Sequence, residues 1–311
     1  MPIKPPHCSR TIRRLCHLID EVTVDSKDNG FEFTNPQRKN YLVGELNKSE
    51  DYVILGEKPL SLIYKHKQFN HDLPFSLISC HIDSIYEKHF SDTPQLEDSE
   101  GGAGRRAWVS LGKGGALIEP KAKIINNCEN EGKIYDVITG TFDNSVCNAI
   151  LLDCILRGGF PHQVLICFTG DEEYQSRGAD ESIGILEELK IKNNLQFVCV
   201  LDVTEEKYDN YPLTIENVFI RNEKWQSSNF PQSIFDQGKF INKFPVFKDA
   251  APDESWQYDK HECDCFSFCL PCKVIGNDMH DNEGVKIRLD SLFLYQRYLK
   301  LWFEKFYRNL E

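Results

Sequence analysis

Hydrophobic residues along the chain gather in short runs, separated by turn-forming and charged residues, and such runs predict buried β-strands. The strands expected from this pattern are residues 52–55, 60–64, 75–80, 163–169, 195–201 and 272–275. The tetrapeptide Gly56-Glu57-Lys58-Pro59 is expected to form the turn between the first two.

Between these runs, hydrophobic residues recur at helical spacing and predict helices over residues 10–21, 144–156, 180–190, 263–270 and 289–307. Asn144 or Ser145 is expected to cap the second of these helices. The last helix carries its hydrophobic residues on one stripe and is expected to pack on the core. Strands that alternate with helices predict an α/β fold of three layers, with a mixed, largely parallel central sheet and helices on both faces.

Residues 87–133 interrupt this rhythm with glycines and charges. Short strands expected at 107–111, 116–118 and 123–125 predict a small β-rich insert. The main domain is therefore expected to comprise residues 1–86 and 134–311.

Composition and charge limit the function classes. The chain has 311 residues, 41% hydrophobic content and a formal net charge of −12, which suits a large globular domain and disfavours binding to nucleic acids or anionic membranes. Its first twenty residues lack the hydrophobic stretch of a secretory signal, and no hydrophobic run is long enough for a membrane helix. The twelve cysteines are therefore interpreted as reduced thiols, and the expected compartment is the cytoplasm.

Residues with metal-binding side chains stand where the expected strands end. They are His81 and Asp83 after 75–80, Glu172 and Glu173 after 163–169, Asp202 after 195–201, His280 shortly after 272–275, and Asp143 just before the helix at 144–156. In open α/β sheets, functional sites form at the carboxyl ends of the strands. We therefore expect these side chains to meet in one site.

Two imidazoles and three carboxylates suit zinc, and cobalt or manganese could substitute for it. Five ligands exceed what one catalytic zinc ion uses, but they fit two ions if one carboxylate bridges them. The two adjacent carboxylates of Glu172 and Glu173 can then have different roles, because one can bind metal while the other transfers a proton.

The chain resembles the co-catalytic di-zinc exopeptidase superfamily, particularly zinc aminopeptidases of the glutamyl/deblocking and leucyl types. The resemblance rests on Ser-Cys-His81-Ile-Asp83, Gly-Thr-Phe-Asp143-Asn, Thr-Gly-Asp-Glu172-Glu173 followed by Ser-Arg-Gly178-Ala179, Leu-Asp202-Val and Met-His280-Asp. These motifs occur in the family's order over about residues 76–280.

The resemblance implies two zinc ions and a role for each residue. Asp143 would bridge the ions, His81 and Asp202 would complete one site, and Glu173 and His280 would complete the other. Glu172 would be the general base, and Asp83 would orient His81. The substrate implied is a peptide cleaved at its N-terminus, and homo-oligomers occur in the family. The segment 250–262 is expected to line the substrate pocket.

Other functions stay open at this point. The same scaffold could serve a carboxypeptidase or an N-acyl-amino-acid deacylase, with Arg177 or Arg221 binding a free carboxylate. A non-catalytic binding protein is a third alternative. The cysteines at 263, 265, 269 and 272 invite a metal site, but packed thiols are the favoured interpretation.

Overall fold

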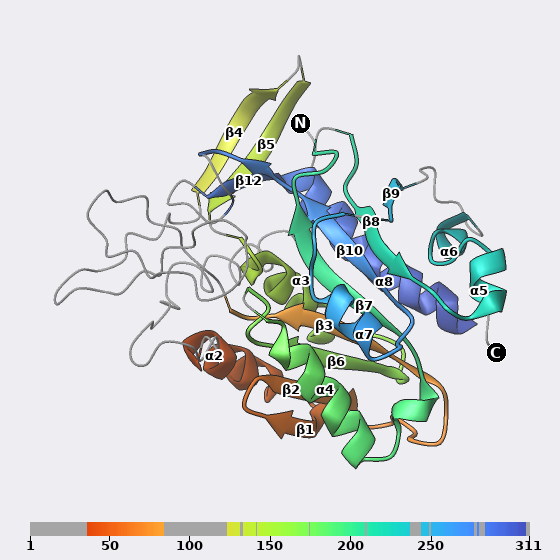
Figure 1. Ribbon diagram of the computed structural model, residues 1–311. Coiled ribbons are helices and arrows are strands. Elements are labelled where there is room, and N and C mark those ends of the chain that lie inside the picture. Colours follow the sequence, from red (N-terminus) through yellow and green to blue (C-terminus); the bar gives the residue numbers. More distant parts are fainter. Residues whose placement is uncertain are drawn as a thin grey trace, which may run out of the picture.

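The computed structural model describes residues 36–83, 123–130, 133–140, 142–173, 175–208, 210–236, 244–248, 250–276, 279 and 284–308. Its main feature is an eight-stranded sheet with the order β1-β2-β6-β3-β7-β10-β8-β9 (Figure 1). The strands are β1 (Tyr52–Lys58), β2 (Ser61–His66), β3 (Phe75–His81), β6 (Val164–Thr169), β7 (Leu195–Thr204), β8 (Thr214–Phe219), β9 (Val246–Phe247) and β10 (Cys265–Pro271). The central strands β6, β3, β7 and β10 are mutually parallel, so their carboxyl ends share one edge.

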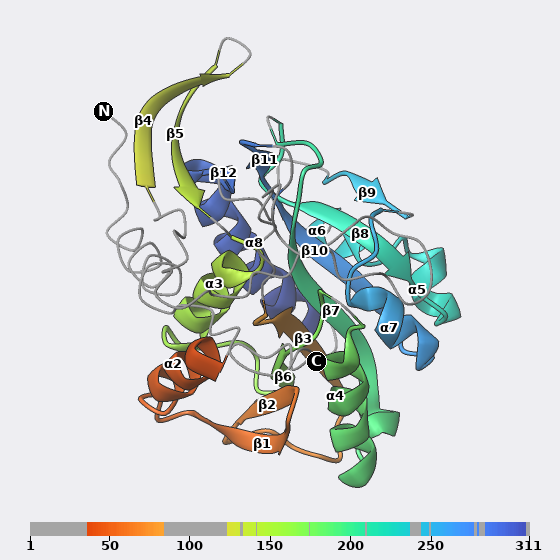
Figure 2. The same cartoon turned by 60° about the vertical axis from the view of Figure 1, so that its left-hand side comes forward.

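Helices cover both faces of this sheet. Their bounds are α2 (Pro36–Leu46), α3 (Ser145–Ile155), α4 (Arg177–Glu188), α5 (Glu223–Ser227), α6 (Gln232–Asp236), α7 (Ser255–Lys260) and α8 (Leu289–Arg308), with a 3-10 turn at Lys192–Asn194. Helices α3 and α8 contact each other on one face, and α4 and α7 contact each other on the opposite face (Figure 2). The predicted three-layer α/β fold is confirmed.

The core consists of two hydrophobic clusters, one under each helical layer. The larger contains Phe197 of β7 and Trp302 of α8, and the smaller contains Ile183 of α4 and Tyr258 of α7. The predicted stripe on α8 is fully inside the larger cluster: Leu292, Tyr295, Leu299, Trp302 and Phe306 are all buried. Strand β3 is buried along its whole length, as expected of a strand with helices on both faces.

A second, four-stranded antiparallel sheet has the order β11-β12-β5-β4. It contains β4 (Lys123–Asn130), β5 (Lys133–Gly140), β11 (Lys273–Val274) and β12 (Val285–Arg288). The strands expected at 123–125 and 272–275 overlap β4 and β11. The proposed insert at 87–133 stays a prediction, and the strands expected at 107–111 and 116–118 lie outside the described residues, as does the helix expected at 10–21.

Two local predictions are wrong. Residues 263–270 were expected as a helix, but β10 occupies Cys265–Pro271. This strand is paired on both edges and buried on both faces, so its hydrophobic run lacks the polar alternation that marks a half-exposed strand. The turn expected at 56–59 also fails, because β1 continues to Lys58 through an irregularity in register between Ile54 and Gly56.

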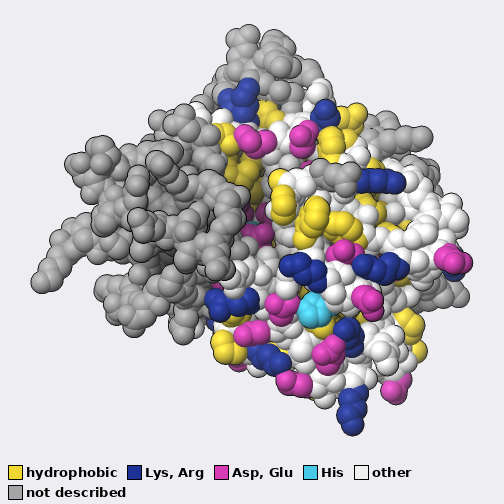
Figure 3. Space-filling view, viewed as in Figure 1, with side chains coloured by type: hydrophobic (Ala, Val, Ile, Leu, Met, Phe, Trp, Pro, Cys, Tyr) yellow, Lys and Arg dark blue, Asp and Glu magenta, His cyan; other side chains and the backbone are white. Residues whose placement is uncertain are grey.

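The surface seen in Figure 3 carries hydrophobic side chains near the middle of the view, with acidic and basic side chains around them. No helix among the described residues is long and hydrophobic enough to cross a membrane.

Candidate metal centre

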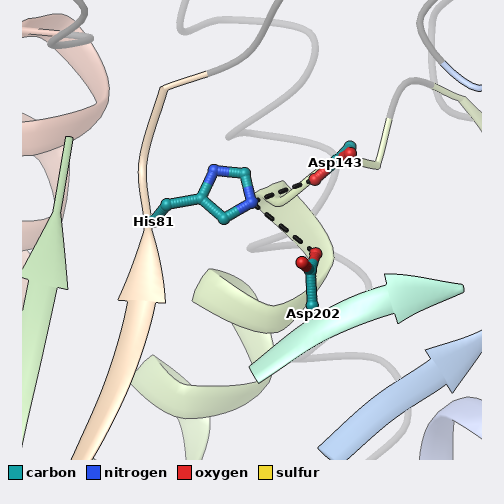
Figure 4. Close-up of side chains that lie close together, drawn as sticks. All are labelled: His81, Asp143 and Asp202. Atoms are coloured by element: carbon teal, nitrogen blue, oxygen red, sulfur yellow. Dashed lines mark ion pairs between the residues drawn. The ribbon is translucent and has the colours of Figure 1, made fainter. Parts of the chain in front are cut away.

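Three predicted ligands converge at the carboxyl edge of the central sheet. His81 is the last residue of β3, Asp202 lies on β7, and Asp143 lies two residues before α3. His81 Nε2 is 3.0 Å from Asp143 Oδ1 and 3.6 Å from Asp202 Oδ1 (Figure 4). One ligand atom from each of the three residues lies within 4.8 Å of the others, a spacing that suits a shared cation.

The pair Glu172-Glu173 joins this group from the loop after β6. Glu172 Oε2 lies 3.9 Å from His81 Nε2, and both glutamates bring a ligand atom within 4.8 Å of His81. Asp83 lies on the other side of the imidazole, with Oδ1 3.5 Å from His81 Nδ1. The second oxygen of Asp83 accepts a hydrogen bond from the backbone N–H of Glu173, at 3.2 Å. Asp83 thus contacts both the histidine and the glutamate loop.

The glutamate loop is held by a tight approach at the start of α4. Gly178 donates its backbone N–H to Gly170 O at 3.1 Å. A Cβ at position 178 would lie 2.5 Å from that same carbonyl oxygen, so only glycine fits. Arg177 Nε forms an ion pair with the buried carboxylate of Asp171 at 2.6 Å, which ties the start of α4 to this loop.

The first turn of α3 fixes the backbone around the ligands. Asn148 donates from Nδ2 to His81 O at 2.8 Å and to Asn144 O at 2.9 Å. Asn144 occupies the predicted cap position, but its amide donates to Leu201 O at 2.6 Å and makes no cap hydrogen bond. Side-chain amides therefore connect the segments that carry His81, Asp143 and Asp202.

The electrostatics of the group are dominated by crowded, buried carboxyl groups. Burial raises the pKa of Asp202 to about 7, and repulsion from Asp143 adds to the effect. Burial also raises the pKa of Glu172 well above its usual range, opposed by His81 and reinforced by Glu173. Burial alone would lower the pKa of His81, but the surrounding carboxylates outweigh it and the pKa is raised.

These residues fit a bound metal. The His81 side chain is only 1% exposed, and neither ring nitrogen has a hydrogen-bond partner among the described residues. One imidazole cannot neutralise Asp143, Asp202, Glu172 and Glu173 together. Nitrogen and carboxylate oxygen donors are the ligands that zinc takes in catalytic sites. The donor set therefore fits a bound cation such as zinc, which would balance the charge of the carboxylates.

A cleft of about 720 Å³ opens onto the group. Asp143, Glu172, Glu173 and Asp202 contribute to its floor. Its further lining includes the acidic residues Glu205, Glu206, Glu216 and Asp253, and Lys260 is the basic residue among the described lining. The cleft is consequently strongly negative.

Segment 250–262 supplies one wall of this cleft, as expected. Asp253, Trp256, Gln257 and Lys260 line it, together with residues 250–252. Trp256 is 41% exposed there, whereas Tyr258 is buried in the core.

Other candidates from the sequence lie elsewhere. His280 is outside the described residues, although the preceding residue, Met279, lines the cleft. Arg177 is paired with Asp171, and Arg221 with Asp259, and neither arginine lines the cleft.

The cysteines at 263, 265, 269 and 272 are all buried. Among the described residues, the groups of three metal-binding atoms within 4.8 Å include no cysteine. Burial raises the pKa of Cys269 and Cys272 well above the usual range, which keeps these thiols protonated. Packing is therefore the favoured role.

Solved structures share this architecture over nearly the whole chain. The aminopeptidase APDkam598 from the archaeon Desulfurococcus kamchatkensis aligns with a TM-score of 0.62 at 14% identity, covering 96% of this chain and 95% of that one. The chain has the fold of known aminopeptidases.

Two further structures extend the comparison. The TET1 peptidase of Pyrococcus horikoshii aligns with a TM-score of 0.57 at 12% identity, over 93% of this chain and 99% of that one. The LapA aminopeptidase of Legionella pneumophila aligns with a TM-score of 0.56 at 14% identity, over 96% of this chain and 71% of that one. No family model matches the chain, and the search of curated proteins found no match. The similarity expected from the motifs is thus confirmed as a similarity of fold.

Proposed function

We propose that this protein is a di-metal aminopeptidase that removes N-terminal residues from peptides. The observation that carries the proposal is a buried histidine surrounded by four carboxylates on the floor of an acidic cleft. His81 and Asp202 would hold one ion, Glu173 and His280 the other, and Asp143 would bridge them. Zinc suits these donors, with cobalt or manganese as substitutes.

When bound, the metal pair would supply a Lewis acid that polarises the scissile carbonyl and acidifies water. Glu172 would take a proton from the attacking water and return it to the departing amine nitrogen. Its position suits this exchange, because Glu172 Oε2 lies 3.9 Å from His81 Nε2, beside the proposed ligands. Asp83 would hold the Nδ1 side of His81 and so fix the ring orientation.

The charge of the cleft favours an aminopeptidase over a carboxypeptidase or deacylase. A substrate with a free α-carboxylate would be repelled by Glu205, Glu206, Glu216 and Asp253, whereas a free α-ammonium would be attracted. The arginines considered for carboxylate binding lie outside the cleft lining.

Two wider features belong to the same proposal. A cytoplasmic location is part of the proposal, because the nine cysteines among the described residues are all free and buried, as is usual in reducing compartments. A homo-oligomer is also proposed, with the TET1 peptidase, which can assemble into a tetrahedron or a large octahedral shell, as a structural precedent.

The test combines metal analysis with a substrate panel. We expect about two equivalents of zinc in purified protein, and hydrolysis of aminoacyl anilides that stops with chelator and returns with zinc. N-acylated amino acids, and peptides blocked at the amino end, should resist cleavage. Protein that binds zinc yet cleaves only acylated substrates would support the deacylase, and protein without metal would support a non-catalytic role.

A further inference from the structure

Glu254 is a buried carboxyl group that the proposed mechanism does not use. Its neighbours in sequence, Asp253 and Trp256, line the cleft, but Glu254 itself is 0% exposed. Its side chain turns inward to the ends of the strands, where Ser79 of β3 donates to Oε2 at 2.6 Å. The other oxygen, Oε1, has no hydrogen-bond partner among the described residues.

Glu254 is the acceptor at the end of a chain of buried hydroxyl groups. Ser79 Oγ also lies 2.9 Å from Tyr258 OH, which lies 3.0 Å from Ser182 Oγ. Ser182 donates its hydrogen to Ala179 O, so it has none left for Tyr258. Ser79 likewise has one hydrogen, which Glu254 accepts. Without the Glu254 carboxyl group, the Ser79 hydroxyl would lose the acceptor of its hydrogen bond in the buried interior, where an unsatisfied donor costs free energy.

This contact connects the cleft wall to the strands that carry the candidate ligands. Ser79 stands two residues before His81 on β3, on the same face of the strand. The Thr169 hydroxyl, at the end of β6, also interacts with Glu254 and lowers its pKa. Thr169 pairs with His81 across the sheet and precedes the loop that carries Glu172.

We propose that Glu254 is a positioning residue that fixes the cleft wall, through Asp253 and α7, against the ends of β3 and β6. The inference rests on the proposed function, because the wall it positions is the one that would contact the substrate. Substrate that binds against Trp256 would then meet the metal centre at a constant distance.

The experiment compares Glu254→Ala with Glu254→Gln, because the glutamine keeps an acceptor oxygen of the same reach. Zinc content, thermal unfolding, KM and kcat for aminoacyl anilides are measured for each full-length variant. Glu254→Ala should raise KM by about tenfold or more. Each kcat is expressed per zinc-loaded molecule. Glu254→Gln should stay within about threefold of the parent. A merely structural role would lower the unfolding temperature and leave KM unchanged.

Asp153→Ala is the matched control, because Asp153 is a fully buried carboxylate on α3 that pairs with Arg157 and does not line the cleft. It should lose stability and keep the parent KM. Ser79→Ala removes the donor of the same bond and should raise KM in the same way, so the test survives if Glu254→Ala does not fold. The effects of Ser79→Ala and Glu254→Ala should not add.

Either of two results would overturn the inference: an unchanged KM in both Glu254→Ala and Ser79→Ala, or a Glu254→Gln variant as impaired as Glu254→Ala. Failure of the proposed function looks different, because the parent protein would then lack aminopeptidase activity altogether.

Discussion

At the scale of single residues, Glu172 and Glu173 are adjacent carboxylates to which different tasks are assigned. Glu172→Gln keeps the size of the side chain and removes its ability to carry a proton. We expect kcat to fall by roughly 10²–10⁴-fold, while zinc content, measured by atomic spectroscopy, stays at the parent level.

Asp143→Ala is the contrasting variant. Removing the carboxylate between the two ligand groups should reduce bound zinc as well as activity, since Asp143 faces His81 at 3.0 Å. A Glu172→Gln protein that retains parent turnover would show that another group carries the proton.

The pH dependence of stability tests the buried state of Glu254. Burial raises its pKa to about 7, against 4.5 in the unfolded chain, with Ser79, Thr169 and His81 lowering it and Asp83 raising it. A raised carboxyl pKa favours the protonated folded state, so this contribution is complete below pH 4.5 and is lost as the pH rises through 7. At 1.36 kcal/mol per pH unit, the loss reaches about 3 kcal/mol by pH 8.

The measurement is urea unfolding of chelator-treated protein between pH 5 and 8. Glu254→Gln has no carboxyl group to ionise, so the parent should lose stability relative to this variant as the pH rises. Titrating groups that do not interact with Glu254 cancel in the difference. Parallel pH curves for the two proteins would show that Glu254 is already ionised at pH 5.

Four candidate ligands, His81, Glu173, Asp202 and His280, could be predicted from the sequence because each follows an expected strand, and sheet geometry brings strand ends together. Asp143 was predicted from its place before a helix and within a motif of the resemblance. Asn148 and Glu254 gave no such signal. Asn148 contacts a carbonyl 67 residues away, and Glu254 contacts a serine 175 residues away. Their importance lies in tertiary contacts that no local pattern contains.

At the scale of elements, helix α3 acts as a connector between β3 and β7 through its amides. Asn148→Leu would remove both hydrogen bonds that Nδ2 donates and leave the His81 carbonyl without this donor. We expect a loss of about 1–3 kcal/mol in the free energy of unfolding, together with weaker zinc binding in a competition titration. Asn193→Ala, at an exposed position, should change neither quantity. Unchanged zinc affinity in Asn148→Leu would limit the role of Asn148 to stability.

The elements were predicted well where a hydrophobic stripe or an uninterrupted hydrophobic run was present in the sequence. Helices α3 and α8 and strands β3, β6 and β7 fall close to the expected ranges. Strand β10, Cys-Phe-Ser-Phe-Cys-Leu-Pro, was missed because it lacks the β-branched residues that mark β3, β6 and β7 as strands. Strand β8, Thr-Ile-Glu-Asn-Val-Phe, was missed because it places a buried glutamate and asparagine in the sheet. Hydrogen bonds satisfy these polar groups: the Thr214 hydroxyl of the same strand donates to Glu216, and Asn217 Nδ2 donates to the distant carbonyl Ala251 O.

At the scale of the whole molecule, the net charge of −12 and the acidic cleft act together on any charged substrate. Negative walls around a partly desolvated cleft raise the local concentration of cations. A peptide with a free amino terminus should therefore be attracted into the cleft, and one that begins with lysine or arginine should be attracted most strongly. One that begins with glutamate should not gain from this attraction.

Ionic strength tests this steering, because salt shortens the Debye length from about 10 Å at 0.1 M to about 3 Å at 1 M. The KM for a lysyl anilide should therefore rise several-fold with sodium chloride, and the preference over a glutamyl anilide should narrow. A Glu205→Gln/Glu206→Gln variant should flatten the salt dependence, since both glutamates line the cleft. The matched variant Glu187→Gln/Glu188→Gln makes the same change in net charge at the far end of α4 and should keep the parent slope. Equal slopes in the two double variants would mean that the net charge, and not the cleft, attracts the substrate.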